Sequence, residues 1–333
     1  MKIVTCYQST DRHLEQIRNN APGYEVIAAS QQDLNKLLPE ADIFLGHIKS
    51  DVDWDEVVHR GKLAWIQSSA AGMDHCLVPQ INDSEISVCS ASGLFANQVA
   101  EQALALTLGL LRGLPGFFNA QQNRSYQRMP TDDLHGKRVG ILGMGGNGIR
   151  ISQILSQFGC RTWATDVFFT QKPATIKKAF PPDDLAQVLQ HAEILIITLP
   201  LLPETRHLIG EQELAQLNPG AYLINVGRGP VIDEAELIKC LQQKRLAGVG
   251  LDVAEIEPLP PESELWTFPN VIITPHVGAQ SATRNDDVTD LFCENLRRYI
   301  KNDRQTQSLI NLVDKSLGFP RPENRYDFDA PLK

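Results

Sequence analysis

Short apolar runs alternate with helical patterns through the first hundred residues of the chain. Each run is five or six residues long and bounded by polar or turn residues, which is typical of a buried strand and too short for a helix. Helical patterns at 11–19 and 31–38 lie between the first three runs. The predicted strands are 2–6, 24–28, 42–46, 63–68 and 86–90. This alternation predicts a small α/β unit with a parallel sheet.

A second alternating series begins at Val139. Its predicted strands are 139–142, 161–165, 192–200, 221–226, 248–253 and 271–274, and its predicted helices are 149–158, 185–191, 211–216 and 234–244. Strands that alternate with helices in this way predict a doubly wound parallel sheet. A last helical pattern covers 281–301, and the tail 316–333, which is rich in Pro, Asp and Arg, is expected to be irregular.

The stretch 98–112 between the two series is apolar on nearly every face. Such a helix has to be covered on all sides, so we expect it to pack between domains and against a second subunit. Asn97 is the expected N-cap. The polar stretch 119–133 is expected to wind over the surface before the second series starts.

Composition narrows the class of protein. The 333-residue chain is 42% hydrophobic and 21% charged, as is ordinary for a soluble globular protein, and its net charge of −9 argues against nucleic acid or anionic membranes as partners. Six scattered cysteines without a C-x-x-C pair indicate reduced thiols, and no apolar signal segment is recognised, so we expect a cytoplasmic protein. The eight histidines show no zinc-ligand spacing, so no metal is expected.

The most informative motif follows the first strand of the second series. Gly143, Gly145 and Gly148 stand at the first, third and sixth positions of G-x-G-x-x-G, between a strand and a helix. They allow the tight turn, the close approach of a pyrophosphate and close packing of helix on strand, respectively. Asp166 ends the next strand, where a carboxylate binds the ribose hydroxyls and repels the 2′-phosphate of NADP. The motif therefore predicts NAD as cofactor.

Three later strand ends carry residues suited to proton and hydride chemistry. Arg228 lies between two glycines, Glu255 and Glu257 follow another strand, and His276 follows the last. A guanidinium can hold a substrate carboxylate and polarise a keto oxygen. A histidine paired with a carboxylate moves a proton near neutral pH.

These residues lie in segments that resemble the D-isomer-specific 2-hydroxyacid dehydrogenase family over nearly the whole chain. Two shorter stretches near the N-terminus also match, 69–74 as the family's substrate-carboxylate loop and 99–101 as the start of its interdomain helix. The main matching segments are 135–143, 200–206, 225–233, 250–261 and 274–278.

The resemblance implies an α/β fold class with two doubly wound parallel-sheet domains, in which a Rossmann dinucleotide-binding domain is inserted in a flavodoxin-like substrate domain. The expected boundaries are 1–98 with 284–333 for the substrate domain, and 99–283 for the NAD-binding domain. A homodimer is also expected, as the family usually forms one.

The resemblance also implies a role for each candidate residue. Arg228 would bind and polarise the 2-oxo acid, His276 would be the acid/base, and Glu257, preferred over Glu255, would hydrogen-bond to His276. Backbone amides at Ala71 and Gly72 would hold the substrate carboxylate. The expected cofactor-binding residues are Gly143, Gly145, Gly146, Asn147, Gly148, Asp166, Thr198, Leu199, Pro200, Val226, Gly227, Asp252, which would hold the carboxamide, His276 and Gly278.

The chain departs from the family pattern in two places. Gly146 and Asn147 stand where the family often has a basic residue and an isoleucine, and Arg150 is the expected partial replacement. Thr198 stands where many relatives carry a histidine under the adenine. We expect these changes to alter cofactor affinity without abolishing binding.

The expected function is an NAD-dependent reductase of small 2-oxo acids, of the glyoxylate or hydroxypyruvate type, that makes D-2-hydroxy acids. One alternative is an NAD(H)-sensing, corepressor-like binding protein that keeps similar residues. Another is 3-phosphoglycerate dehydrogenase, for which Lys49 is the nearby candidate cation. Formate dehydrogenase is disfavoured because the resemblance puts a glutamine at the Glu257 position in that enzyme.

Overall fold

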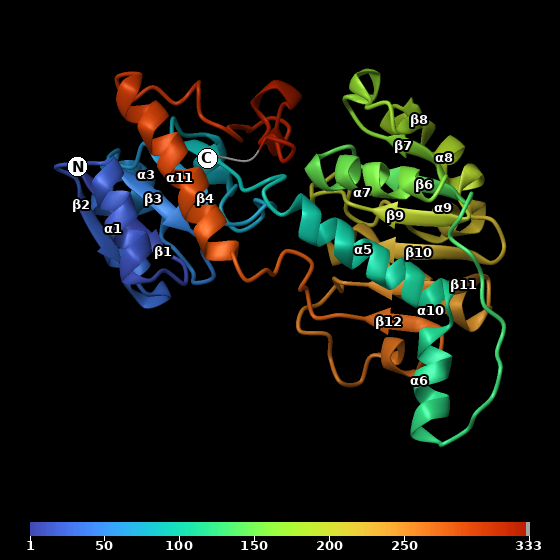
Figure 1. The fold of residues 1–333 in the computed structure, drawn as a ribbon. Coiled ribbons are helices and arrows are strands. Elements are labelled where there is room, and N and C mark those ends of the chain that lie inside the picture. The colour runs from blue at the N-terminus through green and yellow to red at the C-terminus, as the bar shows by residue number, and fades with distance from the viewer. Residues whose placement is uncertain (331–333) are drawn as a thin grey trace. The chain divides into compact units, whose positions relative to one another are not determined.

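The computed structural model describes residues 1–330. The chain forms two compact units (Figure 1): unit 1 comprises Met1–Phe95 and the segment from Ser281 onward, and unit 2 comprises Ala96–Gln280. Each division lies three residues before the boundary expected from the sequence, at 95 against 98 and at 280 against 283. Unit 2 is thus an uninterrupted stretch of chain.

Unit 1 contains a five-stranded parallel sheet in the order β2-β1-β3-β4-β5, which is the flavodoxin-like order. The five predicted strands are confirmed. The strands are β1 (Lys2–Cys6), β2 (Glu25–Ala28), β3 (Ile43–Gly46), β4 (Trp65–Ser68) and β5 (Ser87–Cys89). The helices are α1 (Asp11–Asn20), α2 (Leu34–Leu37), α3 (Trp54–Arg60), α4 (Pro79–Asn82) and α11 (Arg284–Lys301). Trp65 stacks on Phe292 of α11, which fixes this late helix on the sheet.

Unit 2 contains a seven-stranded parallel sheet in the order β12-β11-β10-β9-β6-β7-β8. The strands are β6 (Arg138–Leu142), β7 (Arg161–Thr165), β8 (Ile176–Phe180), β9 (Ile194–Ile197), β10 (Ala221–Asn225), β11 (Leu246–Leu251) and β12 (Val271–Ile273). The helices are α5 (Ala96–Leu111), α6 (Leu114–Gln122), α7 (Gly146–Gln157), α8 (Leu185–His191), α9 (Glu211–Gln216) and α10 (Glu234–Gln242). The strand order reverses between β6 and β9, where doubly wound sheets bind dinucleotides.

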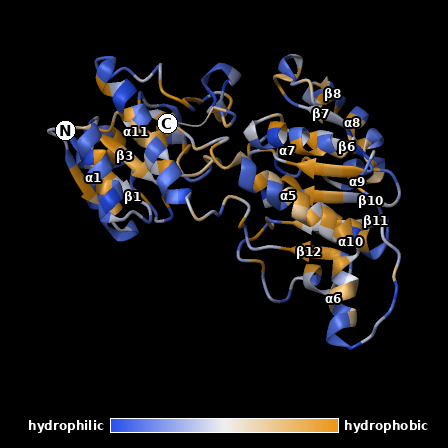
Figure 2. Cartoon of the chain, in the orientation of Figure 1, coloured by the Kyte–Doolittle hydropathy of each residue, from blue (hydrophilic) through white to orange (hydrophobic). Residues whose placement is uncertain are grey.

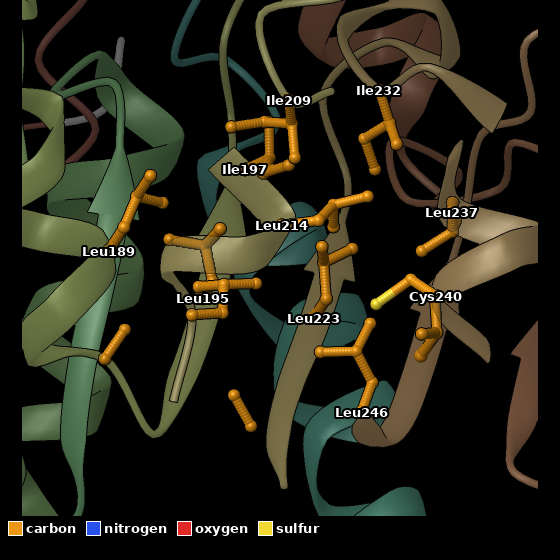
Figure 3. Close-up of a cluster of buried hydrophobic side chains, with 14 of the residues drawn as sticks. Leu189, Leu195, Ile197, Ile209, Leu214, Leu223, Ile232, Leu237, Cys240 and Leu246 are labelled. Carbon is orange, nitrogen blue, oxygen red and sulfur yellow. The ribbon is translucent and has the colours of Figure 1, made fainter. Parts of the chain in front are cut away.

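Helices cover both faces of this sheet. Side chains of α8, α9 and α10 form one apolar core with the sheet, including Leu189, Leu214 and Leu237 (Figure 3). In Figure 2 the strands β9 and β10 are coloured mainly as hydrophobic, as strands covered on both faces should be.

On the other face α5 packs very close to β11. A Cβ atom at Gly248 would lie 2.9 Å from the Leu110 side chain, and one at Gly250 would lie 3.0 Å from Leu106. The two glycines therefore permit the close contact between helix and strand.

The structure corrects one expectation for α5. The helix begins at Ala96, so Asn97 lies in its first turn and is not the N-cap, because burial of Ala96 extends the helix by packing. Within one chain, Leu104 and Leu108 are half-buried and Ala105 is exposed, so the expected packing of this helix against a second subunit stays a prediction.

Regular structure also occurs where the sequence predicted none. The stretch 119–133 begins inside α6, whose apolar residues Phe117 and Phe118 precede the polar run. Strand β8, which was not predicted, carries exposed lysines because it is an edge strand. In the tail, β14 (Phe319–Pro320) pairs with β13 (Val313–Asp314). The last three residues of the tail expectation, 331–333, lie outside the described residues.

Within residues 1–330, no single helix has the length and apolar composition to cross a membrane. The pair α5 and α6, bent by 66°, meets both criteria only when taken together.

Candidate active site

The candidate residues of unit 2 lie at one edge of the sheet, in the turns that follow its strands or in the first turn of α7. Because all seven strands are parallel, the residues just beyond β6, β7, β9, β10, β11 and β12 lie at the same carboxyl edge. The residues that follow these strands include Gly143, Asp166, Thr198, Arg228, Glu257 and His276. The fold thus brings together groups spread over 136 residues of sequence, from 143 to 278.

The glycine turn fits a pyrophosphate. Gly143 has φ +98°, and a Cβ atom at Gly148 would lie 2.0 Å from the Gly143 carbonyl oxygen, so neither position tolerates a side chain. At Gly145, by contrast, no described atom lies within 4 Å of an added Cβ. Gly145 caps α7 without a side chain, which leaves the first amides of a twelve-residue helix open to an anion.

Asp166 and Thr198 both brace this turn. The Asp166 carboxylate accepts hydrogen bonds from the amides of Met144 (2.6 Å) and Phe168 (2.8 Å). The Thr198 hydroxyl lies 3.0 Å from the Leu142 carbonyl oxygen and 3.1 Å from that of Gly143. Thr198 therefore holds the turn in shape, which is not a role the sequence suggested. Arg150, the expected replacement cation, donates to Gln153 on its own helix.

The turn after β10 places Arg228. The buried side chain of Asn225 bridges this turn, since it donates to the Arg228 carbonyl oxygen (3.0 Å) and accepts from the Gly227 amide (3.0 Å). Gly227 packs against the segment after β9, where an added Cβ would lie 2.7 Å from the Leu199 carbonyl oxygen. Val226 is buried, and Pro200 is half-buried. The peptide conformation before Arg228 is thus fixed from both sides.

Asp252 holds the turn that carries His276. Its carboxylate accepts hydrogen bonds from the Thr274 hydroxyl (2.6 Å) and from the amides of Val277 (3.0 Å) and Gly278 (2.8 Å). His276 itself has φ +54°, which is uncommon outside glycine. The Asp252 carboxylate, which is buried, therefore organises a strained turn in addition to any contact with a cofactor.

His276 is paired with Glu257. Its Nδ1 lies 2.8 Å from Glu257 Oε2, and both side chains are partly exposed. Burial alone would raise the pKa of Glu257, but the hydrogen bond and charge of His276, the Ala254 amide and nearby Arg228 outweigh burial and lower it. A carboxylate that stays ionised on Nδ1 leaves Nε2 to exchange a proton with a substrate.

Glu255 does not join this pair. Its Oε1 atom lies 2.7 Å from Nε2 of His207, a residue that the sequence did not single out. Sequence reasoning also missed the side-chain contacts of Asn225 and Thr274, because a polar residue that braces a turn leaves no motif. The one available signal for Asn225 was its position as a buried polar residue at a strand end.

The predicted carboxylate loop lies in unit 1. Ala71 is exposed and Gly72 half-buried, and both follow β4. The Ser68 hydroxyl accepts from the Ala70 amide (3.0 Å), and Arg284 donates to the Ser69 carbonyl oxygen (3.0 Å). The start of the loop is therefore held by side chains of its own unit.

Comparison with known proteins identifies the family. Residues 104–278, about half of the chain, match the family model described as D-isomer specific 2-hydroxyacid dehydrogenase, NAD binding domain. The chain belongs to this family. The matched segment lies within unit 2, so this unit is the family's NAD-binding domain and the glycine turn is part of it.

Individual relatives agree with this assignment. The glyoxylate/hydroxypyruvate reductase A of Arabidopsis thaliana is 32% identical over 264 residues, which is 77% of this chain and 81% of that protein. A family member from Aeromonas salmonicida has a similar structure, with a TM-score of 0.79, 30% identity and coverage of 94% and 99% of the two chains. One from Xanthobacter autotrophicus, solved with NADPH and MES, gives a TM-score of 0.78, 28% identity and coverage of 95% and 99%.

Proposed function

We propose that this family member reduces small 2-oxo acids of the glyoxylate and hydroxypyruvate type to D-2-hydroxy acids, with NADH as the reductant. The observation that carries the proposal is the His276–Glu257 pair, whose acid/base geometry lies at the same sheet edge as Arg228 and the glycine turn. The Arabidopsis relative, which is named for this activity, supports the choice of substrate class.

The proposed reaction gives a role to each candidate catalytic and substrate-binding residue. The bound nicotinamide supplies the hydride to the carbonyl carbon. Arg228 binds the 2-oxo acid and polarises its keto oxygen, and His276, held by Glu257, gives its Nε2 proton to that oxygen. The amides of Ala71 and Gly72 hold the substrate carboxylate. In the oxidative direction His276 takes the proton back.

Steady-state kinetics test the proposal. With NADH the protein should turn over glyoxylate and hydroxypyruvate, and His276→Ala should lower kcat by about 10²–10⁴-fold, because general acid catalysis contributes that much. Equal rates for the protein and for His276→Ala would contradict the proposed role. Tight NADH binding without turnover of any 2-oxo acid would instead favour a nucleotide-sensing protein.

The preference for NADH is also part of the proposal, and it rests on Asp166. A carboxylate at the end of β7, held by two backbone amides, repels the 2′-phosphate of NADP. The Xanthobacter relative was solved with NADPH, so the family accommodates both cofactors. We expect kcat/KM for NADH to exceed that for NADPH at least tenfold, and Asp166→Ser to reduce the ratio. A ratio unchanged by the substitution would exclude Asp166 as its source.

We further propose a cytoplasmic homodimer. Leu108 of α5 is half-buried and Phe118 of α6 is exposed, and we propose that a second copy covers these apolar side chains. Sedimentation of the purified protein distinguishes a dimer of about twice 37.0 kDa from a monomer. Leu108→Glu should shift the distribution toward the monomer, whereas Glu101→Gln on the same helix should not.

A further inference from the structure

We infer that His207 is a positioning residue of the reductase, and that with Glu255 it ties the Arg228 turn to the segment that carries Glu257. The inference deepens the proposed function and rests on it. His207 lies ten residues past the end of β9 at Ile197, outside the glycine turn and outside the His276 pair.

The backbone of His207 is fixed to the Arg228 turn. Its amide donates to the Pro230 carbonyl oxygen at 2.8 Å, and two residues later the Ile209 amide donates to Val231 at 3.0 Å. His207 has φ +53°, so a non-glycine residue accepts a sparsely populated conformation at this point. That conformation directs the chain alongside residues 230–232.

The side chain of His207 reaches the other segment. Nε2 lies 2.7 Å from Glu255 Oε1, while Nδ1 lies 4.0 Å from Asp233 Oδ2. Glu255 also accepts from the Glu234 amide (3.1 Å), and the Glu255 amide donates back to the Glu234 carboxylate (3.2 Å). His207 thus joins a reciprocal pair of contacts between the start of α10 and the segment after β11.

The two segments touch directly beside this pair. A Cβ atom at Gly229 would lie 1.8 Å from the Ala254 carbonyl oxygen, so the residue after Arg228 is in backbone contact with the turn that leads to Glu257. The Ala254 amide in turn donates to Glu257 Oε1 at 3.1 Å. A shift in the Glu255 contact would therefore move Arg228 and Glu257 relative to each other.

The two neighbouring carboxylates of Glu234 and Glu255 favour a hydrogen-bond donor beside them, and His207 can supply one. Glu234 and Glu255 face each other as two carboxylates, and burial, together with the negative charge of Glu255, raises the pKa of Glu234 despite an opposing backbone hydrogen bond. An imidazole N–H on Glu255 stabilises the pair by supplying a donor. Without this imidazole, backbone amides would be the remaining donors to these two partly buried carboxylates.

Two substitutions of His207 distinguish the contribution of its side chain from that of its backbone conformation. Asn tolerates a left-handed φ but is too short to reach Glu255, whereas Gln can place an amide donor there. We expect His207→Asn to lower kcat/KM for the 2-oxo acid roughly tenfold, with a raised KM and an unchanged Kd for NADH, because misplacement of Arg228 affects the substrate and not the glycine turn. His207→Gln should recover most of the loss.

A double-mutant cycle and a surface control complete the test. On a Glu255→Ala background, His207→Asn should have little further effect, because the contact is already lost. Lys239→Gln, which removes an exposed ion pair with Glu236 on the same α10, should leave kcat/KM unchanged. Independent effects of the two substitutions in the cycle would overturn the inference.

Hydrogen exchange separates this inference from the proposed function. His207→Asn should increase exchange at the amides of 230–232, whether or not the protein turns over a 2-oxo acid. If the unaltered protein has no reductase activity, the proposed function fails. The positioning role is then decided by hydrogen exchange and by a double-mutant cycle in which the free energy of unfolding replaces kcat/KM. If the unaltered protein is active and His207→Asn has the same KM, kcat and amide hydrogen exchange, the positioning role fails and the proposed function stands.

Discussion

At the scale of single residues, the candidate site is built by side chains that hold backbone turns and, in the His276–Glu257 pair, another side chain. His276 was expected as a histidine at a strand end, and the family resemblance preferred Glu257 over Glu255 as its partner. The tasks of Asn225 and Thr198 were not predictable, because each bonds backbone atoms whose proximity exists only in the folded turn. Asp252 combines both kinds of role, as its three hydrogen bonds to the His276 turn show.

The lowered pKa of Glu257 gives a pH prediction. A carboxyl group whose pKa falls on folding contributes stability above its unfolded pKa, and the contribution is lost as the pH falls through the folded value. The stabilisation that Glu257 contributes, measured against Glu257→Gln, should therefore be lost as the pH falls below the ordinary glutamate pKa of about 4.3. Urea unfolding from pH 3 to 8 measures it. A difference that already fades near pH 6 would contradict the lowered pKa.

At the scale of elements, periodicity and turn chemistry predicted the helices and strands that have strong internal patterns. The failures are physical: α5 starts earlier than its expected cap because Ala96 is buried, and β8 was missed because exposed lysines conceal an edge strand. The glycine turn between β6 and α7 was predicted because its geometry depends on glycine itself, which no distant contact can replace.

That turn predicts opposite outcomes for two alanine substitutions. Gly145→Ala adds a methyl group into space that no described atom occupies, so the protein should fold normally but lose NADH affinity, since the methyl lies where a pyrophosphate approaches. Gly148→Ala places a methyl against the Gly143 carbonyl oxygen and should cost about 1–3 kcal/mol of stability. Thermal unfolding with and without NADH separates the two. Equal stability of both variants would refute the packing argument.

At the scale of the whole molecule, the division into two units follows the chain, because unit 2 is one uninterrupted segment with its own sheet and core. Its strand order and its match to the family model both indicate a dinucleotide-binding domain. The sequence predicted two domains through the repeated alternation of strands and helices, with boundaries expected at 98 and 283. The first division lies at the start of α5, and the second lies in the turn before α11.

We therefore expect residues 96–280, produced alone, to fold and bind NADH. This segment contains the glycine turn, Asp166, Arg228 and the His276–Glu257 pair, but lacks Ala71 and Gly72. It should show no turnover of glyoxylate, because the proposed carboxylate-binding amides are missing. Calorimetry with NADH and a turnover assay check the two statements. Failure of the soluble segment to bind NADH would mean that the glycine turn is insufficient.

One hydrogen bond shows why unit 2 can be inserted into the chain of unit 1. Gln102, near the beginning of unit 2, donates to Thr274, near its end, at 2.8 Å across 172 positions of sequence. The two ends of the unit therefore meet. Because its ends are close together, a domain of this kind can replace a short surface loop of another domain.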